Sequence, residues 1–261
     1  MFTEMIPLRF AAGGRAIAHI RELTGRDEYS VFGVSTANAI DLLSGLIETR
    51  VDVDGERIHP MDLVAADRDR LLAAIYKGAF GDRIENTLSC NKCGEPFDID
   101  FSLQSVISSV SSTNETVDCV QLHDGTFRFG DGLSFRLPTG RDELAAIGMT
   151  TSEVESLLMK RCTEDREWPE GELEFEELLE KVAPLIDLEL VAACPECRHV
   201  HTIQFDIQTY LLGALVSERR RLLADINTIA ATYSWSLEEI LSLTRSDRRH
   251  LVELIENEYA A

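Results

Sequence analysis

The chain has 261 residues, of which 44% are apolar, enough for one large domain or two ordinary ones with a conventional core. Its 46 acidic residues against 25 lysines and arginines give a formal net charge of −21, which disfavours binding to nucleic acids and anionic membranes and favours a basic or apolar protein partner. No apolar run is long enough to cross a membrane, and the first residues do not form a secretory signal, so we expect a cytosolic setting with reduced thiols.

An octapeptide occurs twice in the chain. Residues 21–28 read RELTGRDE and residues 136–143 read RLPTGRDE, so six of eight positions agree. Apolar residues precede each copy, and the pattern predicts a strand that turns into a helix. In each copy a threonine is expected to cap the helix, with an aspartate three residues on closing a capping box. These pairs are Thr24 with Asp27 and Thr139 with Asp142.

Two segments with helical spacing follow each motif. In the first copy they are residues 37–48 and 66–80, and in the second they are residues 152–162 and 174–185. Pro184 is expected to end the last of these helices, because proline cannot continue a helix. The order of elements after the two motifs is therefore the same.

Each copy then ends in a Cys-x-x-Cys turn between alternating apolar segments. These regions are residues 84–101 and 188–207. The alternation predicts a strand, a tight cysteine turn and a returning strand in both. Chance agreement of a motif and of everything downstream is a poor explanation, so we interpret the chain as two imperfect copies of one unit.

The region between the copies has two parts. Residues 105–116 are rich in serine, threonine and asparagine and are predicted to form a loop or linker. Residues 117–138 alternate apolar and polar positions around HDGT and GDG turns, which predicts a short β-meander.

The C-terminal part is predicted to be helical. Residues 207–233 carry apolar positions near a heptad seam, Ser236 and Glu239 form a capping box, and a last helix is expected to start near Ser246. We expect this tail to dock on the body or on a partner.

The six cysteines include two Cys-x-x-Cys pairs, Cys90 with Cys93 and Cys194 with Cys197. Such a turn supplies two thiolates on one small loop, and zinc prefers four tetrahedral soft ligands. The pairs lie about 100 residues apart, which is far for one site, but equivalent hairpins of two related halves can meet across a pseudo-twofold axis. We therefore predict one structural zinc ion per chain, bound by all four cysteines and without an open position for catalysis.

Other readings of the cysteines are weaker. A thioredoxin-like redox pair needs its knuckle at a helix N-terminus, whereas strands are predicted around both pairs. His199 or His201 could instead complete a separate site with the second pair. Cys119 and Cys162 are isolated and are more typical of small buried apolar residues than of ligands.

These elements predict an α+β fold, with two pseudo-repeated halves of capped helices and a CxxC β-hairpin, joined through a zinc-ribbon-like site, and with a C-terminal helical tail. The predicted division is a first repeat with its hairpin (1–105), a linker and β-meander (106–138), a second repeat with its hairpin (139–207) and a C-terminal helical region (208–261).

No catalytic residues are predicted. The sequence has no GxxxxGK[ST], GxGxxG, HExxH or GxSxG motif, and its six histidines are scattered. We therefore expect a protein that is not an enzyme.

Several stretches together resemble a known family. They are the region from HPMDLV to FDIDF, the segment FRLPTGRDELAAI, the second knuckle CPECRHVHTIQFDI and the ending ATYSWSLEEILSLTRSDRRHLVELIE, spread over residues 59–257. They are similar to the baseplate hub assembly chaperones of T-even-like contractile tails, whose relatives occur in contractile injection systems. The resemblance implies a structural or chaperone role, with hub, spike or other tail proteins as partners. It implies a location in the virion tail baseplate, or in the host cytoplasm during assembly.

Two further hypotheses come from other classes of protein. A cytosolic zinc-ribbon adaptor in transcription or translation would normally present a basic face, which the net charge of −21 disfavours. A CxxC thiol oxidoreductase would need free cysteine pairs, which a shared zinc ion would remove.

Overall fold

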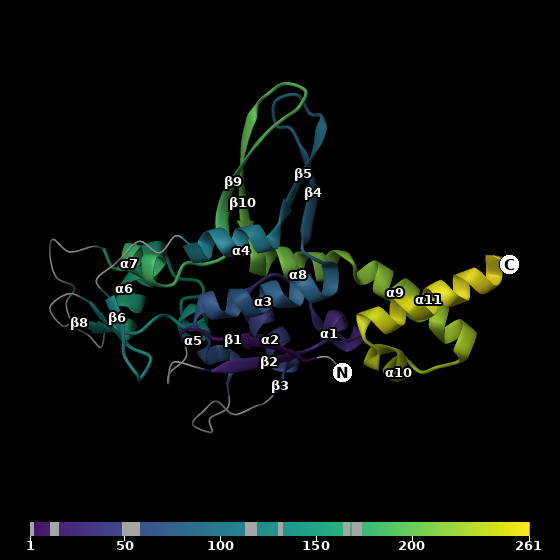
Figure 1. The fold of residues 1–261 in the computed structure, drawn as a ribbon, viewed down its shortest axis with the longest axis horizontal. Coiled ribbons are helices and arrows are strands. Elements are labelled where there is room, and N and C mark those ends of the chain that lie inside the picture. The colour runs from purple at the N-terminus through teal and green to yellow at the C-terminus, as the bar shows by residue number, and fades with distance from the viewer. Residues whose placement is uncertain are drawn as a thin grey trace.

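The computed structural model describes residues 3–10, 16–48, 58–112, 119–129, 133–163, 168 and 174–260. Figure 1 shows a body of helices and small sheets, an arm of two β-hairpins that rises from one side of the body, and a group of helices that leads away from it to the C-terminus. This arrangement is an α+β fold with C-terminal helices, as the sequence predicted.

The N-terminal half forms a small antiparallel sheet of order β1-β2-β3 with helices packed on it. Its elements are β1 (Thr3–Pro7), β2 (Ile17–Arg21), α1 (Gly25–Ser30), α2 (Thr36–Leu46), β3 (Ile47–Glu48), the 3-10 helix η1 (Pro60–Asp62) and α3 (Ala65–Phe80). Leu43, Leu46, Leu71 and Leu72 are fully buried in one core, which confirms the two helices predicted from apolar spacing.

The predicted capping boxes are present in both copies of the octapeptide. The structure also gives a role to the arginine at the start of each copy. Arg21 donates two hydrogen bonds to the Asp27 carboxylate at 2.6 and 2.7 Å, and Arg136 makes the same pair with Asp142 at 2.6 and 2.9 Å. Bidentate pairs of this kind fix geometry as well as add energy, so each octapeptide is a rigid strand-to-helix turn.

The prediction of a loop or linker over residues 105–116 is wrong in the part that the structure describes. The first hairpin, β4 (Arg83–Ser89) and β5 (Pro96–Ser102), leads directly into the helix α4 (Leu103–Ser112). Leu103 and Val106 are buried against the body, and the Asp82 carboxylate accepts a hydrogen bond from a backbone N–H in the first turn. Burial of this short apolar stripe and the N-terminal cap outweigh the weak helix propensity of the serines.

The second half begins with the predicted meander and has its own core. Its elements are β6 (Cys119–Gln121), β7 (Phe127–Phe129), β8 (Leu133–Phe135), α5 (Gly140–Ala145), α6 (Thr151–Cys162), α7 (Phe175–Val182), β9 (Asp187–Ala193) and β10 (Val200–Asp206). The strands pair in the order β6-β7-β8. Phe127, Phe135, Phe175 and Leu178 are buried together. The Trp168 ring meets those of Phe135 and Phe175 edge-on and stacks on that of Phe129.

The C-terminal helices belong to two different cores. They are α8 (Ile207–Ser217), α9 (Arg219–Tyr233), α10 (Leu237–Ser242) and α11 (Arg245–Ala260). Leu211 and Leu212 of α8 are buried in the core of the body, whereas Ile229 and Ile255 are buried in a small core formed by α9, α10 and α11. The helical pattern of residues 207–233 is therefore confirmed, but it is divided at Glu218, and the predicted cap at the start of α10 is present.

Candidate metal centre

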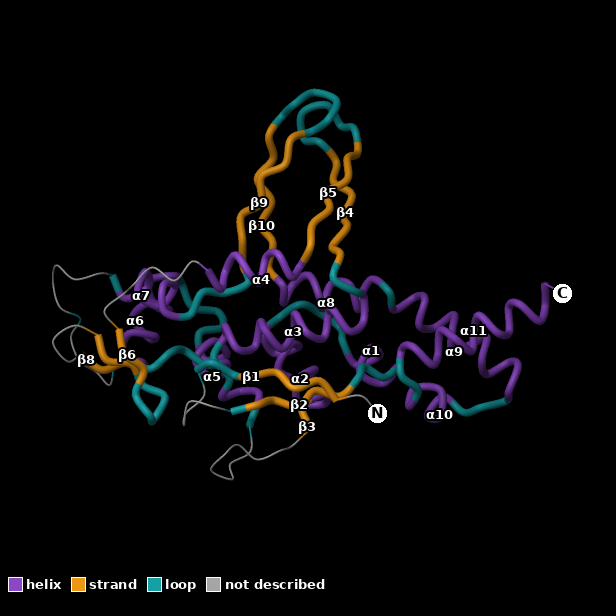
Figure 2. The backbone as a smooth tube through the Cα atoms, viewed as in Figure 1, coloured by secondary structure: helices purple, strands orange, loops and turns teal. Residues whose placement is uncertain are grey.

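The two hairpins of the arm are built alike. Each pairs two seven-residue antiparallel strands, and the last pair before the turn is Ser89 with Pro96 in one hairpin and Ala193 with Val200 in the other. Figure 2 shows the hairpins rising from different points of the body, with their turns coming together at the end of the arm. The repeat in the sequence therefore places the two cysteine turns in equivalent positions.

Each turn is a knuckle closed by the same two backbone hydrogen bonds. The first cysteine donates to a carbonyl five residues on and accepts from the amide four residues on. These bonds measure 2.9 and 2.8 Å at Cys90, and 2.9 and 2.9 Å at Cys194. The residue after the second cysteine is left-handed in both turns, with φ of 81° at Gly94 and 58° at Arg198. Glycine takes this conformation freely, whereas at Arg198 it costs about 1 kcal/mol or more.

The four thiols converge at the spacing of a tetrahedral metal site. The Sγ atoms of Cys90 and Cys197 are 3.6 Å apart, those of Cys93 and Cys194 are 3.8 Å apart, and all four lie within 4.8 Å of one another. Four sulfurs about 2.3 Å from a zinc ion are about 3.8 Å from each other in a tetrahedron. The donor set and its spacing therefore fit one zinc-like ion.

An apolar shell surrounds the thiols. Cys90 and Cys194 are 2% and 1% exposed, and Phe97 is buried beside them. His201 lies with its Nε2 atom 3.3 Å from the Sγ of Cys90, and its ring contacts those of Phe97 and His199. The imidazole can therefore donate a hydrogen bond to a sulfur from outside the ligand set, as metal-site partners commonly do.

The thiols of Cys90 and Cys93 differ in acidity. Burial disfavours the Cys90 thiolate, but hydrogen bonds from the Cys93 and Lys92 amides and from His201 outweigh it and lower its pKa to about 5. The Glu95 amide favours the Cys93 thiolate, but desolvation and hydrogen bonds to three other sulfurs raise its pKa to about 12. Close thiolates repel one another, so a bound cation would favour ionisation of the Cys93 sulfur.

The other cysteines lie elsewhere. Cys162 is buried in the core of the second half, where burial raises its pKa to about 11, and Cys119 is half-buried at the edge of the same core. Strands flank both Cys-x-x-Cys turns, so the helix N-terminus on which a thioredoxin-like thiolate depends is not part of this site.

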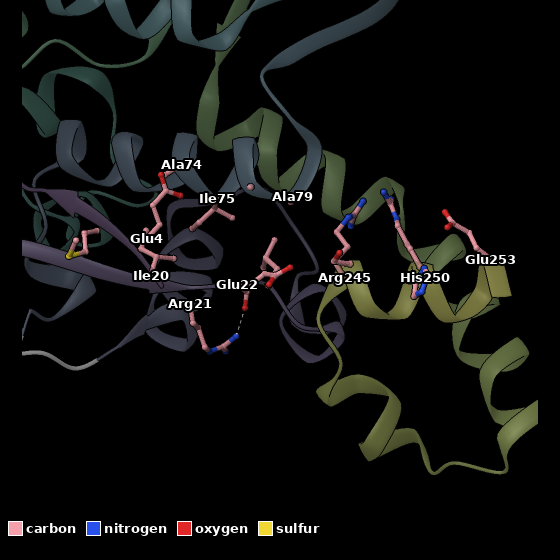
Figure 3. A pocket seen from close by; sticks show the side chains of 15 residues that line it. Glu4, Ile20, Arg21, Glu22, Ala74, Ile75, Ala79, Arg245, His250 and Glu253 are labelled. Carbon is pink, nitrogen blue, oxygen red and sulfur yellow. Dashed lines mark hydrogen bonds between the residues drawn. The ribbon is translucent and has the colours of Figure 1, made fainter. Parts of the chain in front are cut away.

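A groove of about 1140 Å³ lies on another part of the molecule, between the β1–β2 strands, α3 and α11 (Figure 3). Apolar residues such as Ile20 and Ile75 line it together with charged residues such as Glu4 and Arg245. Figure 3 shows the charged side chains spread along the groove. The groove contains none of the cysteines.

Sequence reasoning missed a set of buried charges that hold the fold together. They include Asp69, which accepts a hydrogen bond from the Ile186 amide at 3.0 Å, and Glu28, which pairs with Arg245 and Arg248. A second comparison within the sequence could have found the pair of Glu28 with Arg248. Residues 243–248 read LTRSDR and residues 63–68 read LVAADR, so Arg248 corresponds to Arg68, which pairs with Glu143 of the other octapeptide.

Fold and site together define a duplicated α+β protein with a four-cysteine cluster at the end of an arm. In the part of the chain that the structure describes, no helix is long and apolar enough to cross a membrane. The family model described as T4 bacteriophage base plate protein matches residues 11–212, about three-quarters of the chain. The chain therefore belongs to the T4 bacteriophage base plate protein family, a structural family of the virion tail whose members associate with other tail proteins. No curated protein and no solved structure matches it.

Proposed function

We propose that this protein is a non-catalytic structural or assembly component of a contractile-tail baseplate hub, stabilised by one zinc ion bound at Cys90, Cys93, Cys194 and Cys197. Family membership supports the baseplate role. The single observation that carries the rest is the convergence of four thiols, two from each half of the chain, at the spacing of a tetrahedral ion.

The ion would act as a cross-link between the halves. The two hairpins of the arm contact each other at both ends. At the base the ring centroids of Phe101 and Phe205 are 5.1 Å apart, and at the tip the cysteines pack with a small apolar cluster. A structural zinc site contributes on the order of 10 kcal/mol of binding free energy to folding. Bound at the tip, it would hold two long hairpins as one rigid projection.

A rigid arm on an acidic protein is consistent with a scaffold or chaperone that binds another tail protein. The net charge of −21 favours a basic or apolar contact surface on that partner. Hub and spike proteins are the proposed partners, at the virion baseplate or in the host cytoplasm during assembly.

Co-purification tests this function. The full-length protein is expressed with the hub and spike proteins of the same tail, beside a Cys90→Ser/Cys194→Ser variant and a Cys119→Ser control. We expect the wild type and the control to retain a hub or spike protein, and the double variant to retain much less. Retention of no tail protein, with RNA polymerase or ribosomes bound instead, would replace the baseplate role with the adaptor role.

A further inference from the structure

Each of the two octapeptide turns packs against another segment of the chain. The two segments that receive the turns have similar sequences. We call residues 24–28 and 139–143 the turn motifs, and residues 61–68 and 241–248 the docking segments. Each docking segment has a leucine, an aspartate and an arginine at the same positions, and each opens a helix of 16 residues, α3 or α11. The second docking segment lies beyond residue 212, where the family match ends.

The backbones dock in the same way. The amide of Gly140 donates to the Leu63 carbonyl at 3.1 Å, and the amide of Gly25 donates to the Leu243 carbonyl at 3.0 Å. In both cases the threonine of the turn motif forms an antiparallel bridge with the residue after that leucine. The second turn motif thus docks on the first docking segment, and the first turn motif docks on the second.

The close approach explains the glycine in each turn motif. A Cβ atom on Gly140 would lie 3.2 Å from the Met61 carbonyl oxygen and 3.5 Å from its Cα. A Cβ atom on Gly25 would lie 3.2 Å from the Leu241 Cα, at the corresponding position of the other segment. Only glycine lets the backbones come this near without a shift, so the glycine of each turn motif lies against the first residue of its docking segment.

An ion pair made by a buried arginine completes each contact. The Arg68 guanidinium donates to both oxygens of Glu143 at 2.9 Å. In the second contact Arg248 donates to one oxygen of Glu28 and Arg245 donates to the other, both at 2.8 Å. Arg248 and Glu28 are 1% and 4% exposed. Removal of either one leaves the other buried charge with only its remaining partner, which is Arg245 for Glu28 and Asp225 for Arg248.

The two contacts differ in how the arginine meets the glutamate. The Nη1 atom of Arg248 is buried and has no hydrogen-bond partner in the described part of the chain, whereas Arg68 uses both of its Nη atoms on Glu143. In the first contact one arginine binds both carboxylate oxygens of its glutamate. In the second contact Arg245 binds the Glu28 oxygen that the Nη1 atom of Arg248 would otherwise bind.

We propose that residues 241–248 form a binding site for a Thr-Gly-Arg-Asp-Glu strand-to-helix turn, and that Arg248 is its specificity-determining residue through Glu28. In the folded chain this site is occupied by the first turn motif of the same chain. The C-terminal helices therefore bind the first repeat in the way that the start of α3 binds the second. This site depends neither on the metal centre nor on the baseplate role.

Hydrogen exchange of the full-length protein tests the site. In Glu28→Arg and in Arg248→Glu we expect exchange of the α10 and α11 amides to rise by at least about tenfold, because like charges then face each other in a buried contact. The combined Glu28→Arg/Arg248→Glu variant restores opposite charges between these two positions, whereas Arg245 and Asp225 beside them keep their own charges, so it should recover part of the protection. Amides of α3 should be unaffected, and Arg68→Glu with Glu143→Arg provides the matched pair at the other contact.

A milder variant keeps the test decisive if the charge reversals unfold the unit. Arg245→Ala removes contacts with Glu28, Glu218 and the Phe80 ring. It should still raise exchange of α10 and α11 less than Arg248→Ala does, because Arg248 can then offer both nitrogens to Glu28 as Arg68 does to Glu143. Arg248→Ala should raise it strongly. Equal damage from the two alanine variants, or no recovery in the combined charge reversal, would overturn the proposal.

Discussion

The Sγ atoms of Cys90 and Cys197 lie 3.6 Å apart, although 107 positions separate the two residues in the chain. The Sγ atoms of Cys93 and Cys194 lie 3.8 Å apart, so this contact also joins one hairpin to the other. An ion at this place would therefore be shared by the two halves, and the properties of the arm should depend on both knuckles at once.

Loss of one ligand should loosen both hairpins. In Cys194→Ser we expect faster proteolysis within residues 83–102 as well as within 187–206, because three thiolates no longer close the tetrahedral shell. Limited proteolysis with mass spectrometry measures both, and Cys119→Ser is the control outside the cluster. Faster cleavage of only the mutated hairpin would show that the halves do not share an ion.

The two knuckles should respond oppositely to changes at their left-handed residue. Arg198→Gly removes the strain of φ 58° and should raise the free energy of unfolding by up to about 1 kcal/mol. Gly94→Ala introduces the same strain at φ 81° and should lower it by a similar amount. Thermal unfolding of the zinc-loaded proteins measures both. A lower Tm in Arg198→Gly would mean that the arginine side chain makes a stabilising contact.

Asp69 should make stability fall as pH rises. Burial raises the pKa of this carboxyl from 3.8 to about 7. Between these values the folded protein holds a proton that the unfolded chain releases, so the contribution is fully present below about pH 4 and is lost as pH rises through 7.

Asp69→Asn imitates the neutral acid, and its carbonyl can still accept the Ile186 amide hydrogen bond. Urea unfolding at pH 5 and pH 8 should show the variant gaining stability relative to wild type at the higher pH. An equal difference between the two proteins at both pH values would rule out titration of this group.

The core of the body should depend on α8. Leu211 is fully buried, so Leu211→Ala should cost about 2–5 kcal/mol of unfolding free energy through lost burial and a cavity. Leu223 on α9 is 47% exposed, and Leu223→Ala should change stability by less than about 0.5 kcal/mol. Urea denaturation compares them, and a similar cost for both would place α8 outside the cooperative core.

Local signals predicted the features that depend on neighbouring residues. The capping boxes of both turn motifs, the β-meander and the strands around each knuckle follow from residue types a few positions apart, and the structure contains them all. The clustering of the four cysteines followed from the internal repeat, because equivalent hairpins can meet. The four-part division of the chain remains a prediction.

Long-range packing decided what the sequence alone did not reveal. The serine-rich segment is helical because Leu103 and Val106 are buried against the body. The helical pattern over residues 207–233 is divided because α8 and α9 bury their apolar faces in different cores. The contact of Glu28 with Arg248 spans 220 positions, and the likeness of residues 243–248 to residues 63–68 is the signal in the sequence that points to it.

The metal content of the purified full-length protein tests the central claim most directly. Elemental analysis combined with X-ray absorption should find one zinc ion per chain, bound by four sulfurs at about 2.3 Å. Protein purified without any metal, with four thiols that react freely, would contradict the account, as would zinc that stays bound at full occupancy in the Cys90→Ser/Cys194→Ser variant.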